Sequence, residues 1–193
     1  MVRLGLDGLA GSEVCAGAHL GHDVLVKLLA EVTREPGMPV LVFLDFAKVE
    51  VATASFLRES VLAFRGFVRA QRPSYYPVVA NANVQVCEEL KMLLDLQGEA
   101  LLMCDLDNEG RASNVQLLGR LEGKQYQAFE LVRERVETDA TQLQTEFGER
   151  EGVKQTAWNN RLSALAASGL VIETSQGRSK RYRAITGEAV GGG

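Results

Sequence analysis

The stretch VKQTAWNNRLSALAASGLVIETSQGRSKRYRAI, residues 153–185, restricts the possible folds of this chain more than any other part of the sequence. Its apolar residues recur first at helical spacing and then in short runs, with glycines between them. The expected elements are, in chain order, a helix over 154–167, a stop at Gly169, a strand over 170–174, a basic turn over 175–179 and a strand over 182–185. A helix followed by a basic two-stranded ribbon is typical of a nucleic-acid-binding surface.

The predicted helix has two different faces. Trp158, Leu162 and Leu165 gather on one side of a helical wheel and are expected to anchor it. The other side is polar, and its Asn and Gln side chains can hydrogen-bond to adenine edges. Basic side chains in the turn suit contacts with backbone phosphates. The expected DNA contacts are Lys154, Gln155, Thr156, Asn159, Asn160, Arg161 and Ser163 in the helix, and Arg178, Lys180 and Arg181 in the basic ribbon that follows it.

Charge is divided unevenly along the chain. The 193 residues include 21 Lys and Arg against 25 Asp and Glu, for a net charge of −4 at pH 7. Residues 150–187 alone carry seven basic and two acidic residues, whereas residues 1–149 carry 14 basic and 22 acidic residues. A basic segment on an acidic chain favours nucleic-acid binding by that segment, although the overall charge argues against it.

Two further helices are expected before this stretch, over 124–136 and 140–147, with a turn over 148–152. Residues 124–186 resemble the winged helix-turn-helix domains of bacterial regulators, and RLSALAASGLVIE (161–173) followed by a basic turn and RYRAI is the specific part. The resemblance implies binding to duplex DNA, often as a homodimer. Two alternatives stay open, which are a winged helix used for protein contacts and one used for dimerisation. Tyr126 and Phe129 suit either a dimer seam or the core of the module.

Strands and helices alternate before residue 122, which favours an α/β sandwich or open sheet. The run VLVFLDF (40–46) predicts a strand buried on both faces. Pro77 predicts an edge or strand-end position, because proline has no N–H for the ladder. A change of periodicity near Glu122 marks a boundary. The expected strands cover 3–6, 40–46, 75–81, 100–106 and 115–121, and the expected helices cover 18–33, 53–70 and 83–96.

The segment VFLDFAKVEVATASFL (42–57) resembles the central strand, loop and helix of STAS-like domains, including the anti-sigma-factor antagonists. In the antagonists this loop carries Asp-Ser-Ser-Gly, with the second serine as phosphoacceptor. Ser55 falls at that position, Thr53 replaces the aspartate, and Ala54 and Phe56 depart from the pattern. The resemblance implies an N-terminal STAS-like α/β sandwich and a site for a kinase or ATPase partner at Thr53 and Ser55. Thr53 also suits a helix N-cap, where a phosphate on Ser55 would meet free N–H groups.

Other motifs do not support catalysis or metal binding. The three cysteines are far apart, which favours free thiols in a reducing compartment. His19 and His22 have no third ligand near them, and the glycine-rich start lacks a phosphate-loop pattern. The acidic cluster Asp105, Asp107 and Glu109 reads more readily as a solvated turn than as a metal or acid–base site. We therefore expect no metal, no cofactor and no enzyme activity. No apolar run is long enough to cross a membrane.

These patterns predict three regions: a STAS-like α/β domain over 1–121, a winged helix-turn-helix domain over 122–187 and a disordered tail over 188–193. The first hypothesis is a cytoplasmic DNA-binding transcriptional regulator whose STAS-like domain senses a protein partner or ligand. The second is a protein-interaction switch of the anti-sigma-factor-antagonist type, with the winged helix as an adaptor. A third is an enzyme that uses the acidic turn.

Overall fold

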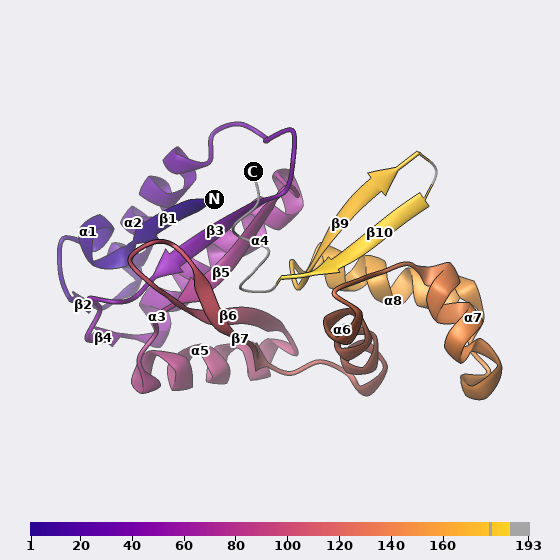
Figure 1. Cartoon of the computed structure of the whole chain (residues 1–193). Helices are drawn as coiled ribbons and strands as arrows, with labels where there is room; N and C mark the ends of the chain where they lie inside the picture. Colours follow the sequence, from indigo (N-terminus) through magenta and orange to yellow (C-terminus); the bar gives the residue numbers. More distant parts are fainter. Residues whose placement is uncertain (178, 186–193) are drawn as a thin grey trace. The chain divides into compact units, whose positions relative to one another are not determined.

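The computed structural model describes residues 1–177 and 179–185, without the side chains of residues 149–151 and 176. Arg178 and the tail expected over 188–193 therefore lie outside the described residues. The described chain forms two compact units, Met1–Arg120 and a second unit that begins at Leu121 (Figure 1).

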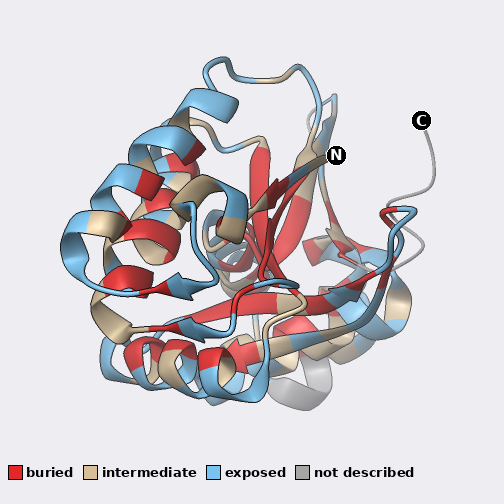
Figure 2. Cartoon of the chain, turned by 90° about the vertical axis from the view of Figure 1, so that its left-hand side faces the viewer, coloured by how far each residue is buried: buried red, intermediate tan, exposed pale blue. Residues whose placement is uncertain are grey.

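The first unit is built on a five-stranded sheet of mixed direction. Four strands are parallel and the last is antiparallel to its neighbour, in the order β1-β3-β5-β6-β7. The strands are β1 (Val2–Gly5), β3 (Val40–Asp45), β5 (Tyr75–Ala80), β6 (Ala100–Leu106) and β7 (Ala112–Gly119). The α/β class is thus confirmed. Residues 41–46 are all buried, as their continuous apolar run predicts (Figure 2).

The edge position expected for Pro77 is wrong, because β5 is the central strand of the sheet. Pro77 lies opposite Val42 of β3. On its other side, β5 pairs with β6 only at Val79 and Ala80, so the end that carries Pro77 has no β6 partner. The central strand tolerates a residue without an N–H because its pairing is incomplete where that residue lies.

Helices pack against the sheet around one hydrophobic core, which includes Val24, Leu44, Phe64 and Leu90. The expected helix 53–70 is a continuous run with a π-helical turn in its middle, and Thr53 is its N-cap as predicted. Two-residue strands, β2 (Val14–Cys15) and β4 (Val51–Ala52), form a small parallel sheet that the sequence did not indicate. The helices are α1 (Leu6–Ala10), α2 (Ala18–Glu31), α3 (Ala54–Leu57), η1 (Arg58–Leu62), α4 (Ala63–Gln71) and α5 (Val84–Gln97).

The second unit combines three helices with a three-stranded antiparallel sheet of order β8-β10-β9. Its elements are α6 (Gly123–Arg135), β8 (Glu137–Thr138), α7 (Ala140–Glu151), α8 (Gln155–Ala167), β9 (Val171–Gln176) and β10 (Ser179–Ala184). Trp158 and Tyr182 are fully buried in it, and Phe129 belongs to the buried set too. Tyr126 is 48% exposed, so the two aromatic residues of α6 have different environments.

The helix expected over 140–147 is longer than predicted, and the turn expected over 148–152 is correspondingly wrong. Asp139 and Gln142 form a capping box at the start of α7, which fixes its first turn. The helix then continues to Glu151 and ends where Gly152 adopts a left-handed conformation, with φ of 61°. Gly148 therefore lies inside the helix rather than in a turn.

Candidate nucleic-acid interface

The second unit has a groove of about 430 Å³ between the start of α7, the polar side of α8 and the strand β10. We call it the α8 groove. It is lined by Asp139, Ala140, Thr141, Gln155, Asn159, Ser163, Ser179 and Lys180. The structure thus brings together Gln155, Asn159, Ser163 and Lys180, four of the residues predicted to contact DNA.

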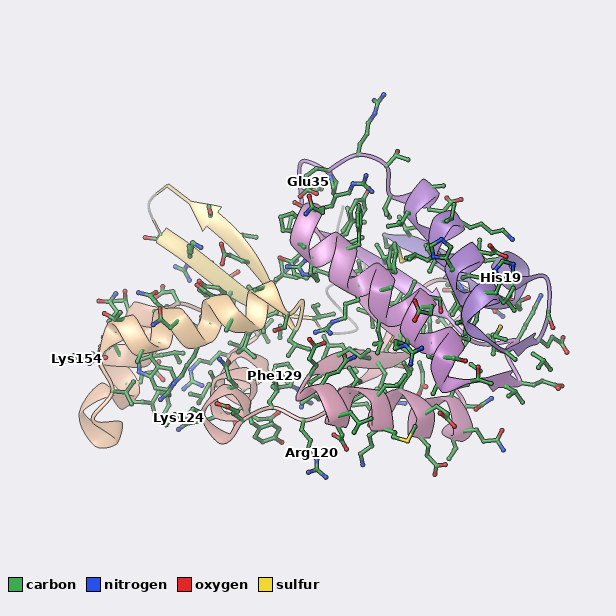
Figure 3. All side chains as sticks on the ribbon, turned by 180° about the vertical axis from the view of Figure 1, so that it is seen from behind. His19, Glu35, Arg120, Lys124, Phe129 and Lys154 are labelled. Carbon is green, nitrogen blue, oxygen red and sulfur yellow. The ribbon has the colours of Figure 1, made fainter. Side chains whose placement is uncertain are left out.

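Helix α8 is fixed by its apolar side, as the sequence predicts. Trp158 and Leu162 are fully buried, whereas Thr156, Asn159 and Asn160 are exposed. Lys154 is the N-cap position and is exposed at the start of the helix (Figure 3). The helix therefore presents a row of amide and hydroxyl groups, chemistry that can hydrogen-bond to base edges.

Two of the polar side chains in the groove already have partners within the unit. The Nε2 of Gln155 donates to the Oγ1 of Thr141 at 2.8 Å. The hydroxyl of Ser163 lies 3.0 Å from that of Tyr182, which ties α8 to the middle of β10. Asn159 is exposed beside them. The groove therefore contains the exposed amide of Asn159, for which no hydrogen bond is seen among the described residues, next to two hydrogen-bonded pairs that position its walls.

Arg161 lies against an aromatic ring instead of extending from the polar face. Its guanidinium carbon is 4.6 Å from the centre of the Trp158 ring, a cation–π geometry. One of its terminal nitrogens is buried and has no hydrogen-bond partner among the described residues. This arrangement gives Arg161 a packing role in addition to any contact with a phosphate.

The basic residues of β10 form ion pairs within the unit. The Nζ of Lys180 is 2.7 Å from a carboxylate oxygen of Glu173 on β9, and this hydrogen bond raises the pKa of Lys180. Arg181 lies 3.3 Å from Glu137 and 3.9 Å from Asp139. Both cations predicted to contact phosphates are therefore matched by carboxylates. Arg178, the third, lies outside the described residues.

Thr53 and Ser55 lie together at the start of α3 in the first unit. The Oγ1 of Thr53 accepts from the backbone N–H of Gly17 at 3.1 Å and of Phe56 at 3.4 Å, and it is 3.2 Å from the Oγ of Ser55. Thr53 is thus a structural cap that joins the start of α2 to the start of α3. Ser55 is partly exposed in the first turn, where a phosphate would meet backbone N–H groups.

A second hollow, of about 420 Å³, lies beside Thr53. We call it the Thr53 hollow. It lies between β4 and α5 and is lined by Val51, Ala52, Thr53, Gln85, Glu88, Glu89 and Met92. Val51 is 40% exposed and Met92 50%, so the hollow offers apolar as well as acidic surface. The sequence did not single out its α5 residues, because on a helical wheel they belong to an ordinary solvated face.

The acidic residues around Asp107 form a hydrogen-bonded turn, as the sequence favours. The carboxylate of Asp107 accepts from the backbone N–H groups of Glu109 and Arg111 and pairs with the Arg111 side chain. These hydrogen bonds lower the pKa of Asp107. Among the described residues, no group of three or more His, Cys, Asp or Glu side chains is placed to hold a metal ion. The three cysteines are free thiols.

Groove residues that the sequence did not predict as contacts are Asp139, Ala140, Thr141 and Ser179. The place of Asp139 in the groove depends on the tertiary packing of α7 against α8. No helix among the described residues has the length and apolar character needed to cross a membrane. A comparison with protein-family models and with curated proteins finds no match to this chain.

Proposed function

We propose that the chain is a DNA-binding transcriptional regulator, in which the second unit is a winged helix-turn-helix domain that contacts duplex DNA. The observation that carries the proposal is the α8 groove, where the polar face of α8 lies beside Lys180 of β10. The element order helix, strand, helix, helix, strand, strand supports the assignment. In this proposal α8 is the recognition helix and the β9–β10 hairpin is the wing.

The chemistry of the exposed surface supports direct contacts with bases. Asn159 and Asn160 each offer an amide donor and acceptor, the pair of groups that matches the major-groove edge of adenine. Thr156 and Lys154 lie one helical turn nearer the N-terminus, where a phosphate would meet the positive end of the helix. The contact set of the proposal is completed by Gln155, Arg161, Ser163, Lys180, Arg181 and Arg178.

Binding of the full chain to labelled duplex DNA, followed by fluorescence anisotropy at several salt concentrations, tests this proposal. We expect affinity to fall as salt rises, with the slope reduced by about 0.9 for each lost phosphate contact in Lys180→Ala and Arg181→Ala. Asn159→Ala should cost about 1–3 kcal/mol on a preferred sequence and much less on other sequences. Gln85→Ala, on α5 of the first unit, is the control and should bind as the wild type does. If the wild type does not bind duplex DNA at low salt, the proposal is wrong.

The proposal gives the first unit a regulatory role as a STAS-like domain that senses a protein partner or ligand. A cytoplasmic location follows from DNA binding and agrees with three free thiols. Binding as a homodimer is part of the proposal, since winged helices often bind paired half-sites. Analytical ultracentrifugation with and without DNA tests this component separately.

A second candidate function is a protein-interaction switch, with the second unit as an adaptor. The Thr53 hollow favours it, because apolar and acidic surface lies directly beside Thr53 and near Ser55. Ser55→Asp adds negative charge there and is expected to change the affinity for a kinase or ATPase partner, whereas Ser55→Ala leaves the charge unaltered. If both substitutions leave partner capture unchanged and the wild type binds DNA, the regulator is favoured over the switch.

A further inference from the structure

The β9–β10 hairpin carries a carboxylate on the same face as the groove. Glu173 lies opposite Tyr182 in the antiparallel register, and Lys180 is two residues from Tyr182 along β10. Side chains two residues apart in a strand lie on the same face, so Glu173, Lys180 and Tyr182 share one side of the hairpin. Tyr182 contacts Ser163 of α8, which shows that this side faces the helix.

Glu173 holds Lys180 at the wall of the α8 groove. The Lys180 Nζ is 2.7 Å from the carboxylate, and the two side chains are 53% and 26% exposed. The carboxylate is thus the less exposed partner of the pair. A phosphate that approaches Lys180 must compete with an anion that is already in contact, and that anion also repels the phosphate.

Arg181 shows the same arrangement on the opposite face of the hairpin. It lies between Glu137 of β8 and Asp139, the N-cap of α7. The distances, 3.3 and 3.9 Å, are longer than in the Lys180 pair. The shortest of these ion pairs is therefore the one whose cation lines the groove.

We propose that Glu173 limits the affinity of the α8 groove for DNA by occupying Lys180, so that binding requires a phosphate to replace the carboxylate of Glu173. This inference rests on the proposed function, because it assigns Glu173 a role in the same interface. Such an internal competitor weakens binding to every sequence by the same amount. Contacts between the polar face of α8 and base edges then decide which sequences remain bound at physiological salt.

A double-mutant cycle in the full chain tests the role of Glu173. The four proteins are wild type, Glu173→Gln, Lys180→Ala and the double variant, each titrated into a mixed-sequence DNA duplex. We expect Glu173→Gln to bind about threefold to tenfold tighter at low salt, the size expected for removing one charge at a few ångströms. Its salt slope should stay close to that of the wild type, because Lys180 contacts one phosphate in both complexes. When Lys180 is alanine, Glu173→Gln should increase the affinity only as much as the loss of any one negative charge does.

Glu122→Gln is the matched control, because it makes the same change of net charge at an exposed residue outside the groove. Thermal unfolding followed through Trp158 checks that each variant keeps the second unit folded. Equal gains in Glu173→Gln and Glu122→Gln, or a full gain that persists without Lys180, would overturn the inference while leaving the proposed function intact. Absence of DNA binding by the wild type and by Glu173→Gln refutes both.

Discussion

Gly21 in α2 gives the sharpest prediction, because its effect on stability should be opposite to that of a second helical glycine. Gly21 is buried, and a Cβ added to it would lie 2.8 Å from the carbonyl oxygen of Phe56 and 3.0 Å from the Cβ of Glu59. Phe56 is fully buried, so the backbone of α3 has little room to move away. We expect α2 to be displaced from α3, and with it the contact between Gly17 and Thr53.

The magnitude follows from two opposing effects. Alanine is the better helix former by about 1 kcal/mol, and overpacking of a tight core contact costs about 1–3 kcal/mol. We therefore expect Gly21→Ala to lower the free energy of unfolding by up to about 2 kcal/mol. Gly66 lies in α4, is exposed and has no atom within 4 Å of an added Cβ. Gly66→Ala should raise the free energy of unfolding by about 0.5–1 kcal/mol.

Urea unfolding followed by far-ultraviolet circular dichroism measures both variants. Trp158 is the only tryptophan of the chain and lies in the second unit, so its fluorescence is an internal reference for the unit that is not mutated. A gain in stability for Gly21→Ala equal to that for Gly66→Ala would refute the close approach of α2 and α3. A loss for Gly66→Ala would refute the assignment of open space around α4.

Two further predictions concern backbone strain and buried thiols. Val136 has φ of 65° and ψ of −45°, which is strained for a β-branched residue, and its side chain is 53% exposed. Val136→Gly should therefore raise the unfolding free energy of the second unit by about 1 kcal/mol, read from Trp158 fluorescence in urea. Burial raises the pKa of Cys15 to about 11 and that of Cys104 to about 12, from 9.0. The thiols of the unfolded chain therefore lose their protons at a lower pH than those of the folded chain. The free energy of unfolding should fall as pH rises above 9.0, and it should fall less steeply in a variant with alanine at both cysteines.

Long periodic segments could be predicted from the sequence, whereas elements of two residues could not. Helices α2 and α5 were expected within about two residues of their observed ends, because each has an apolar face several turns long. Strands β4 and β8 have only two residues each, which is too short for any periodicity. Each nevertheless leads directly into a capping residue, Thr53 or Asp139, and so positions a candidate site. The short strands that position the two candidate sites were therefore the elements that the sequence predicted least well.

For α8, the sequence predicts which side chains are buried but not which side chains they contact. A helical wheel separates Trp158 from the polar residues correctly, because burial follows the angle around the helix axis. It places Ser163 on the polar face, and the sequence suggested a DNA contact for Arg161. Their partners, the Tyr182 hydroxyl and the Trp158 ring, depend on where β10 crosses the helix and on a side-chain rotamer. Neither is encoded in the spacing of residues along one helix.

The number of basic residues in a segment overstates the positive charge that its surface presents, because some of these residues form ion pairs with carboxylates elsewhere in the second unit. The excess of basic residues over 150–187 includes Lys180 and Arg181 but leaves out Glu137 and Asp139, which precede that segment and lie against Arg181. An ion pair has little field beyond a Debye length of about 8 Å at physiological salt. Seven independent phosphate contacts would give a salt slope of about −6. Lys180 and Arg181 can contact phosphates only by leaving their carboxylates, so we expect a lower affinity than seven such contacts would give. The hydrogen-bonding face of α8 should then provide a correspondingly larger share of the binding.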